Sequence, residues 1–374
     1  MLYAINISFH VLHAWINLQK HVVKSAKSWY KKKRLQKEFR SKKFSLRIVM
    51  AHQKQRQDYA PTIPQLIIEQ NVSLADKNWF QTGGLAKFFA EPKTAAEFEQ
   101  ALKFAQKNKL EIFMLGQGAN ILISDDGFDG LVIRPQITEM SFAQHDATMA
   151  YVKAGAGAVF HDLISYCLDR NLLGLEEFSG IPGTVGGSVY INLHYYEFLL
   201  EQFLVNAQII HKATGEIITV DPKWFKFGYD QSRLQEKEYY LVSATFQLKH
   251  ATDLEIARAR GRREEIIRHR ERRYPTVRTC GSFFRNFLPA EVANTDKKLI
   301  YVAYYLDKLG VKGELSVGDA IVSHQHANMI VNRGKATSTD IIKLVQLMQK
   351  MVFEKFGIKP QPECQLIGFP KNTL

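Results

Sequence analysis

The stretch Gly174-Leu-Glu-Glu-Phe-Ser-Gly-Ile-Pro-Gly-Thr-Val-Gly-Gly-Ser-Val-Tyr-Ile-Asn192 decides the fold class of this chain. It places five glycines and one proline in a short apolar run, a composition that favours neither a regular helix nor a strand. Glycine allows positive φ and has no Cβ, so backbone N–H groups can lie against a flat or anionic ligand. The spacing differs from the three-glycine fingerprint of Rossmann folds. We predict a cofactor-binding loop, with an ordinary turn as the alternative.

A second glycine cluster supports the ligand interpretation. Residues 110–115 have the pattern of a buried strand and run into Gly116-Gln-Gly-Ala-Asn120, after which 121–123 are apolar again. Another strand is expected at 131–134. Two glycine-rich loops about sixty residues apart, each between strands, suit a long cofactor with a pyrophosphate in its middle.

Elsewhere the chain alternates helices and strands before a region that is mostly strands. The periodicity predicts helices over 94–105, 161–170 and 251–273, and strands over 203–211, 217–220 and 239–248. Thr94 is the expected N-cap of the first helix. The pattern indicates an α/β organisation with mixed sheets.

Composition agrees with a globular protein of two or three domains, since 46% of the 374 residues are hydrophobic and 23% are charged. Cys167, Cys280 and Cys364 have no metal-ligand spacing and form an odd set, which argues against a secreted disulfide framework. We therefore expect a cytoplasmic protein without a metal site.

The net charge of +13 is concentrated at the N-terminus, because residues 1–50 hold twelve Lys or Arg against Glu38 alone. The rest of the chain carries only +2 of that total, so we expect no nucleic-acid partner. Two interpretations of the tail stay open: translation starting at Met50, or an amphipathic helix that is either solvated or weakly associated with a membrane. Its apolar run is too short to span a bilayer and lacks a basic region before it, so neither stable insertion nor a secretory signal is expected.

Five motifs occur in a fixed order over roughly 290 residues. They are Asn78-Trp-Phe-Gln-Thr-Gly-Gly84, Gly116–Asn120, Gly180-Ile-Pro-Gly-Thr-Val-Gly-Gly187, Gly281-Ser-Phe-Phe-Arg-Asn286, and Pro362-Glu363 before Ile367-Gly368. Together they resemble the UDP-N-acetylenolpyruvoylglucosamine reductases of bacterial peptidoglycan synthesis, the MurB family, in its shorter form.

The resemblance implies an α+β fold: an FAD-binding domain of the vanillyl-alcohol-oxidase (PCMH) type with a smaller α/β substrate domain. We expect a basic tail over 1–60, an FAD-binding domain in two subdomains over 61–250, a substrate-binding domain over 251–374, and a monomer. The implied FAD-binding residues are Gly116, Gln117, Gly118, Ala119, Asn120, Gly180, Ile181, Pro182, Gly183, Thr184, Gly186 and Gly187.

The implied chemistry is a hydride relay in which NADPH reduces FAD and the flavin reduces an enolpyruvyl ether carried by a UDP-sugar. Negative charge then develops beside the substrate carboxylate and must be stabilised and protonated. In the family a serine of a Gly-Ser motif supplies the proton and a glutamate assists, which correspond here to Ser282 and Glu363. A serine is a weak acid, so this transfer depends on fixed geometry.

The resemblance also indicates residues that bind the substrate. Tyr229, Arg273, Asn286 and His326 occupy the corresponding positions. Phe283 and Phe284 are expected in the core and the pocket wall.

The chain departs from the family pattern in two places. The usual Tyr-Arg-x-Ser motif, whose arginine polarises the substrate carboxylate, is here Tyr229-Asp-Gln-Ser232, so a carboxylate replaces a guanidinium. Arg233 is a candidate to compensate if the turn is helical, since it would then share a face with Asp230. In Asn192-Leu-His-Tyr-Tyr196, Leu193 and His194 add bulk where small residues are usual.

These departures keep three alternatives open. The first is a diverged FAD-linked oxidoreductase of the same fold with weak or altered activity. A related FAD-linked oxidase of small hydroxy acids is the second, although it leaves the Gly281-Ser282 and Pro362-Glu363 motifs unexplained. The third is a non-catalytic flavoprotein anchored to membrane or nucleic acid by the basic tail.

Overall fold

A computed structural model describes residues 65–293 and 300–374 of the chain. The basic tail predicted over 1–60 therefore lies outside the described residues. Within the described ranges, no helix is long and apolar enough to cross a membrane.

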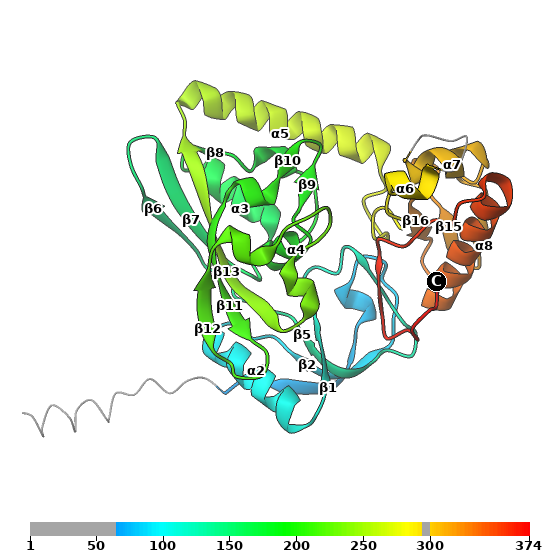
Figure 1. The fold of residues 1–374 in the computed structure, drawn as a ribbon, viewed down its shortest axis with the longest axis horizontal. Helices are drawn as coiled ribbons and strands as arrows, with labels where there is room; N and C mark the ends of the chain where they lie inside the picture. Colours follow the sequence, from blue (N-terminus) through cyan, green and yellow to red (C-terminus); the bar gives the residue numbers. More distant parts are fainter. Residues whose placement is uncertain (1–64, 294–299) are drawn as a thin grey trace, which may run out of the picture. The chain divides into compact units, whose positions relative to one another are not determined.

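A four-stranded mixed sheet forms the first layer (Figure 1). Its order is β1 (Ile68–Ser73), β2 (Leu85–Ala90), β5 (Phe128–Ile133) and β3 (Glu111–Met114), with only the β1–β2 pair antiparallel. Helix α2 (Ala95–Lys107) shares an apolar core with this sheet. The hydroxyl of Thr94 accepts a 3.1 Å hydrogen bond from Glu97 N, which confirms the predicted N-cap.

A second, six-stranded sheet is antiparallel throughout. The order is β12 (Ile217–Val220), β11 (Leu204–His211), β13 (Tyr239–His250), β7 (Met149–Gly155) and β6 (Met140–Gln144), and β8 (Leu172–Leu173) also pairs with β13. The predicted strands over 203–211, 217–220 and 239–248 are confirmed within two residues at each end. The expectation of mixed sheets holds for the first sheet only.

Helices α3 (Phe160–Leu168), α4 (Val185–Tyr190) and the first turns of α5 (Asp253–Arg273) build one core with the second sheet. The expectation that the glycine-rich stretch contains no regular helix is wrong for α4. Thr184 caps this helix by accepting a 3.2 Å hydrogen bond from Gly187 N. A Cβ at Gly186 would lie 3.0 Å from the carbonyl oxygen of Ala156, so this glycine serves close packing.

The C-terminal region has a core of its own. It contains a three-stranded antiparallel sheet of β14 (Ser316–Val317), β15 (Ala320–Val322) and β16 (Ile330–Asn332), with helices α6 (Pro289–Val292), α7 (Val302–Lys308) and α8 (Ser338–Phe356). The predicted core residues Phe283 and Phe284 are buried within it. The division at residue 250 stays an interpretation, because Ile256 and Ala259 of α5 pack into the preceding core.

Two further pairs of short strands complete the fold. Strand β17 (Gln365–Ile367) lies parallel to β4 (Ile121–Ile123), and Gln365 N donates to the carbonyl of Asn120 at 3.1 Å. The start of β17 therefore lies against Asn120, the last residue of the first glycine-rich loop. Strands β9 (His194–Tyr195) and β10 (Phe198–Leu199) form a hairpin after α4.

Candidate functional site

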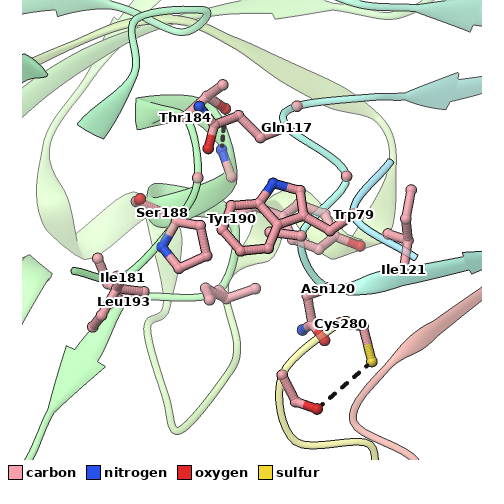
Figure 2. Close-up of a pocket in the computed structure, with 18 of the residues that line it drawn as sticks. Trp79, Gln117, Asn120, Ile121, Ile181, Thr184, Ser188, Tyr190, Leu193 and Cys280 are labelled. Carbon is pink, nitrogen blue, oxygen red and sulfur yellow. Dashed lines mark hydrogen bonds between the residues drawn. The ribbon is translucent and has the colours of Figure 1, made fainter. Parts of the chain in front are cut away.

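Both glycine-rich loops line one cavity of about 560 Å³, a size typical of cofactor sites. Figure 2 shows Gln117 of the first loop beside Thr184 of the second. The wall includes every residue that the family resemblance assigns to FAD: Gly116, Gln117, Gly118, Ala119, Asn120, Gly180, Ile181, Pro182, Gly183, Thr184, Gly186 and Gly187.

Close backbone approach explains two glycines of the first loop. A Cβ at Gly116 would lie 2.9 Å from Thr184 Oγ1, so the two loops are in contact. Gly118 has φ +68°, and a Cβ there would lie 2.6 Å from Asn78 Cα. The N–H of Trp79 donates to the Gly118 carbonyl at 3.0 Å. The motif that begins at Asn78 therefore packs against the first glycine-rich loop at Gly118.

The cavity wall also fits FAD in its polar groups. Asn120 and Tyr240 line it, and Asn120 Oδ1 and Tyr240 Oη are buried without a hydrogen-bond partner among the described residues. Buried polar atoms are nearly always paired in folded proteins, so each of these two atoms lacks a partner that a ligand of this cavity could supply. A flavin and its nucleotide carry both donors and acceptors that could satisfy them.

A second cavity of about 450 Å³ adjoins the first, and residues including His194, Tyr195, Arg270 and Ser282 line both. Of the residues that the family resemblance assigns to the substrate, Arg273, Asn286 and His326 line this second cavity. The arrangement offers one space for a cofactor and an adjacent one for a substrate.

Ser282 lies at the junction of the two cavities, and Glu363 lines the first. Gly281, which precedes the serine, has φ +80°, a conformation that glycine adopts without strain. Ser282 forms a β-bridge with Met329, and Glu363 N donates to the Phe283 carbonyl at 2.8 Å. The fold thus brings the two predicted catalytic residues to one wall.

The carboxyl group of Glu363 is strongly perturbed. Burial, and then the charge of Asp230, raises the pKa of Glu363 from 4.5 to about 8. Glu363 is therefore a carboxylic acid at neutral pH and can donate a hydrogen bond.

Tyr229 is 57% exposed and contacts both His194 and Asn286. Its ring lies 4.6 Å from the ring of His194, and its hydroxyl accepts a hydrogen bond from Asn286. Burial and the charges of Asp230 and Glu363 raise the pKa of Tyr229 to about 12, so it stays a phenol. It lies beside the two cavities, outside the set of residues that line them.

His326 is a neutral donor in the second cavity. Burial, helped by the charge of Arg273, lowers its pKa to about 4. Its Nδ1 accepts from Asn328 N at 3.3 Å, so the proton lies on Nε2. Arg273 itself lies 5.7 Å from the ring of Tyr274 and lines the same cavity.

Sequence reasoning missed Arg270, which lines both cavities and whose Nε donates to the Gly180 carbonyl at 3.0 Å. Burial lowers the pKa of Arg270, and no carboxylate of the described residues forms an ion pair with it. A half-buried cation without a counter-ion favours an anionic ligand. Helix α5 contains eight arginines, and nothing in its sequence distinguishes Arg270 from the other seven.

Comparisons with known proteins agree with this geometry. A model of the C-terminal domain of UDP-N-acetylenolpyruvoylglucosamine reductase matches residues 272–367, and a model of an FAD-binding domain matches residues 86–221. The UDP-N-acetylenolpyruvoylglucosamine reductase of Lactobacillus delbrueckii subsp. bulgaricus is 34% identical over 81% of this chain and 96% of its own length. The chain belongs to the UDP-N-acetylenolpyruvoylglucosamine reductase family.

Other members of the family are similarly related. The reductase of Caldicellulosiruptor saccharolyticus is 32% identical over 79% of this chain and 90% of its own length. The crystal structure of the enzyme from Thermus caldophilus aligns with a TM-score of 0.64 at 27% identity, over 81% of this chain and 99% of that one. The expected α+β fold with an FAD-binding domain is confirmed.

The structure does not place Arg233, the residue considered as a replacement for the family's arginine, on either cavity wall. The turn is not helical at Asp230, which has φ +53°, and the helical turn η5 (Arg233–Glu236) begins only at Arg233. Its Nε lies 3.3 Å from Glu236 Oε2, and its guanidinium packs 4.8 Å from the ring of Trp224. The proposed face shared with Asp230 is therefore absent. Asp230 itself lines the first cavity, as do Leu193 and His194.

Proposed function

We propose that this protein reduces the enolpyruvyl ether of UDP-N-acetylenolpyruvoylglucosamine to UDP-N-acetylmuramate in peptidoglycan synthesis, with FAD as cofactor and NADPH as reductant. Membership of the family supports this activity. One observation carries this proposal. Ser282 lines both the cofactor-sized cavity and the second cavity, and the protonated carboxyl group of Glu363 lines the first.

The protein has to supply charge stabilisation and a proton. When bound, FAD supplies the hydride that it has accepted from NADPH. Addition of hydride to the terminal carbon leaves negative charge on the neighbouring carbon and its carboxylate. We assign Ser282 as the donor that protonates this carbon, and Glu363 as a hydrogen-bond donor to the developing charge.

The second cavity supports recognition of a UDP-sugar. Arg270 and Arg273 place two guanidinium groups on its wall, which suit a diphosphate. His326 adds a neutral N–H donor, and Asn286 an amide. We propose that these four residues bind the diphosphate and sugar while Tyr229 covers the reacting end.

Anaerobic mixing tests the proposal directly. The purified holoprotein is first reduced with NADPH, and the enolpyruvyl UDP-sugar is then added while the flavin absorbance is recorded. We expect bleaching followed by recovery of the oxidised spectrum, with UDP-N-acetylmuramate as product. Bleaching without recovery would refute the assignment.

Asp230 supports a second candidate, a diverged oxidoreductase of the same fold with a lower rate or a changed substrate. A carboxylate on the wall beside Glu363 adds negative charge where an enolate forms. Slow recovery in the anaerobic experiment, together with faster reoxidation by another unsaturated acid, would favour this candidate.

We further propose a cytoplasmic location, since NADPH and UDP-sugars are cytoplasmic metabolites, and a monomeric state. Fractionation of cells and light scattering of the purified protein test these two points.

A further inference from the structure

Two aromatic rings lie beside the guanidinium group of Arg270. Its central carbon is 5.2 Å from the ring centre of Tyr274 and 5.9 Å from that of Tyr195. Both distances fall within the range over which the face of an aromatic ring attracts a cation. Tyr274 is the C-cap residue of α5, four residues after Arg270, whereas Tyr195 ends β9. Two segments distant in sequence therefore supply the rings.

The second glycine-rich loop contacts the stem of the same side chain. Arg270 Nε donates to the Gly180 carbonyl at 3.0 Å. A Cβ at Gly180 would lie 3.1 Å from Arg270 Cδ, and the backbone there has φ +76°. Glycine therefore leaves the space that the arginine stem occupies. The two terminal nitrogens, Nη1 and Nη2, have no hydrogen-bond partner within residues 65–293 and 300–374.

Arg270 is a permanent cation, because a guanidinium group does not lose its proton in proteins. It is half-buried, and no Asp or Glu side chain in the described part of the chain forms an ion pair with it. A cation in such a place costs free energy unless an anion compensates it. The two rings offset part of that cost but contribute no net charge. The free nitrogens and the missing counter-ion both point to an anionic ligand.

Two diphosphates are candidates for this ligand. Arg270 lines both cavities and contacts Gly180 of the loop assigned to FAD, so the diphosphate of the cofactor is one of them. The other is the diphosphate of the substrate. Arg273 lies 5.7 Å from the same Tyr274 ring and lines the second cavity only. Two guanidinium groups beside one ring on the wall of the second cavity favour the substrate's diphosphate.

We propose that Tyr195 and Tyr274 are positioning residues that hold Arg270 where the two cavities meet, with its terminal nitrogens directed to the diphosphate of the UDP-sugar. The identity of the ligand in this inference rests on the proposed function. A free arginine side chain has many rotamers, and restricting them before binding lowers the entropy that binding costs. The rings therefore raise the affinity for a diphosphate without contacting it.

Tyr195 offers the cleaner test of this idea. Its ring lies near one cation of the described residues, Arg270, whereas the ring of Tyr274 also contacts Arg273 and the ring of His326. The matched control is Tyr304 in α7, which is 40% exposed, lies 5.6 Å from the ammonium group of Lys308 and lines neither cavity.

Calorimetric titration of the FAD-loaded protein with UDP measures the affinity without turnover. Tyr195→Leu should weaken UDP binding by roughly 5-fold, and Tyr195→Phe should restore it to within about twofold, because phenylalanine keeps the ring. Tyr304→Leu should have no effect. If UDP does not bind the unchanged holoprotein, or if it binds the Tyr195→Leu variant equally well, the inference is overturned.

A double-mutant cycle tests whether the ring acts through the arginine. Arg270→Gln should weaken UDP binding by about tenfold or more, since it removes a charge-assisted contact. Adding Tyr195→Leu to that variant should cause no further loss, because the group that the ring positions is gone. An undiminished second loss would mean that Tyr195 contacts the ligand itself, which contradicts the positioning role.

Titration of the apoprotein with FAD distinguishes the two diphosphates. Tyr195→Leu should change the FAD affinity by less than about twofold while it weakens UDP binding. The reverse result, a loss of FAD affinity with unchanged UDP affinity, would assign Arg270 to the cofactor and overturn the inference. If Tyr195→Leu does not fold, Tyr274→Leu and its rescue by Tyr274→Phe test the other ring.

Steady-state kinetics separate this inference from the proposed function. Tyr195→Leu should raise the KM for the enolpyruvyl UDP-sugar and leave kcat within about twofold, as expected when binding energy is lost equally from the ground state and the transition state. A fall in kcat at unchanged KM would contradict the positioning role. If the unchanged holoprotein does not reduce the enolpyruvyl substrate, the proposed function is refuted, and the UDP titrations still decide whether the rings position Arg270.

Discussion

The backbone N–H of Glu363 donates a 2.8 Å hydrogen bond to the carbonyl of Phe283, the residue that follows Ser282. Two segments distant in sequence are therefore adjacent at the level of the backbone. This pairing sets the positions from which the serine and the glutamate reach the cavity wall.

Ser282→Ala should leave reduction of the flavin by NADPH intact and slow reoxidation by the enolpyruvyl substrate by ~100-fold or more. The reason is that only the second step consumes a proton from the protein. Stopped-flow absorbance measures both steps in one preparation. Equal losses in both would mean that Ser282 has a structural role.

Glu363 should make the stability of the protein depend on pH. Its pKa is about 8 in the folded chain and about 4.5 when unperturbed. Between these values the native state holds a proton that the unfolded chain has lost, so the free energy of unfolding falls as the pH rises. Melting temperatures between pH ~5 and ~8 should decline less in Glu363→Gln than in the unchanged protein. Parallel declines would contradict the raised pKa.

Gly118→Ala should weaken FAD binding by about tenfold or more. The backbone at Gly118 has φ +68°, and the new Cβ would lie 2.6 Å from Asn78 Cα, so the loop must shift. Gly261→Ala in α5 is the matched control, since a Cβ there meets nothing within 4 Å. Fluorescence titration of the two apoproteins with FAD measures the difference. Equal affinities would show that the first loop does not hold the cofactor.

Arg233→Ala should change the rate of flavin reoxidation by less than about twofold. Its guanidinium pairs with Glu236 and packs on Trp224, away from the cavity wall. Loss of a charge-stabilising donor from the site would instead cost ~100-fold or more. Such a loss would place Arg233 at the substrate after all.

Local rules made much of this protein predictable. The strands over 204–211, 217–220 and 239–250 follow from their apolar patterns, and the start of α2 follows from Thr94. The glycine loops were identified because close approach and positive φ require glycine at fixed positions, as at Gly118. The short helix α4 was not predicted because glycine has a low helix propensity. In the folded chain, the Thr184 cap and the packing of Gly186 on Ala156 outweigh this propensity.

The sequence by itself determined the glycine-rich loops, the main strands and the order of the motifs, because each depends on neighbouring residues in the chain. Only the tertiary structure decided which charges meet. It turned Arg233 outward to Glu236 and placed Arg270 on both cavities. It also set Asp230 Oδ1 3.5 Å from His194 Nδ1, on the wall of the cavity that Glu363 lines. Electrostatic interaction depends on distance and burial, and both are set by how remote segments pack.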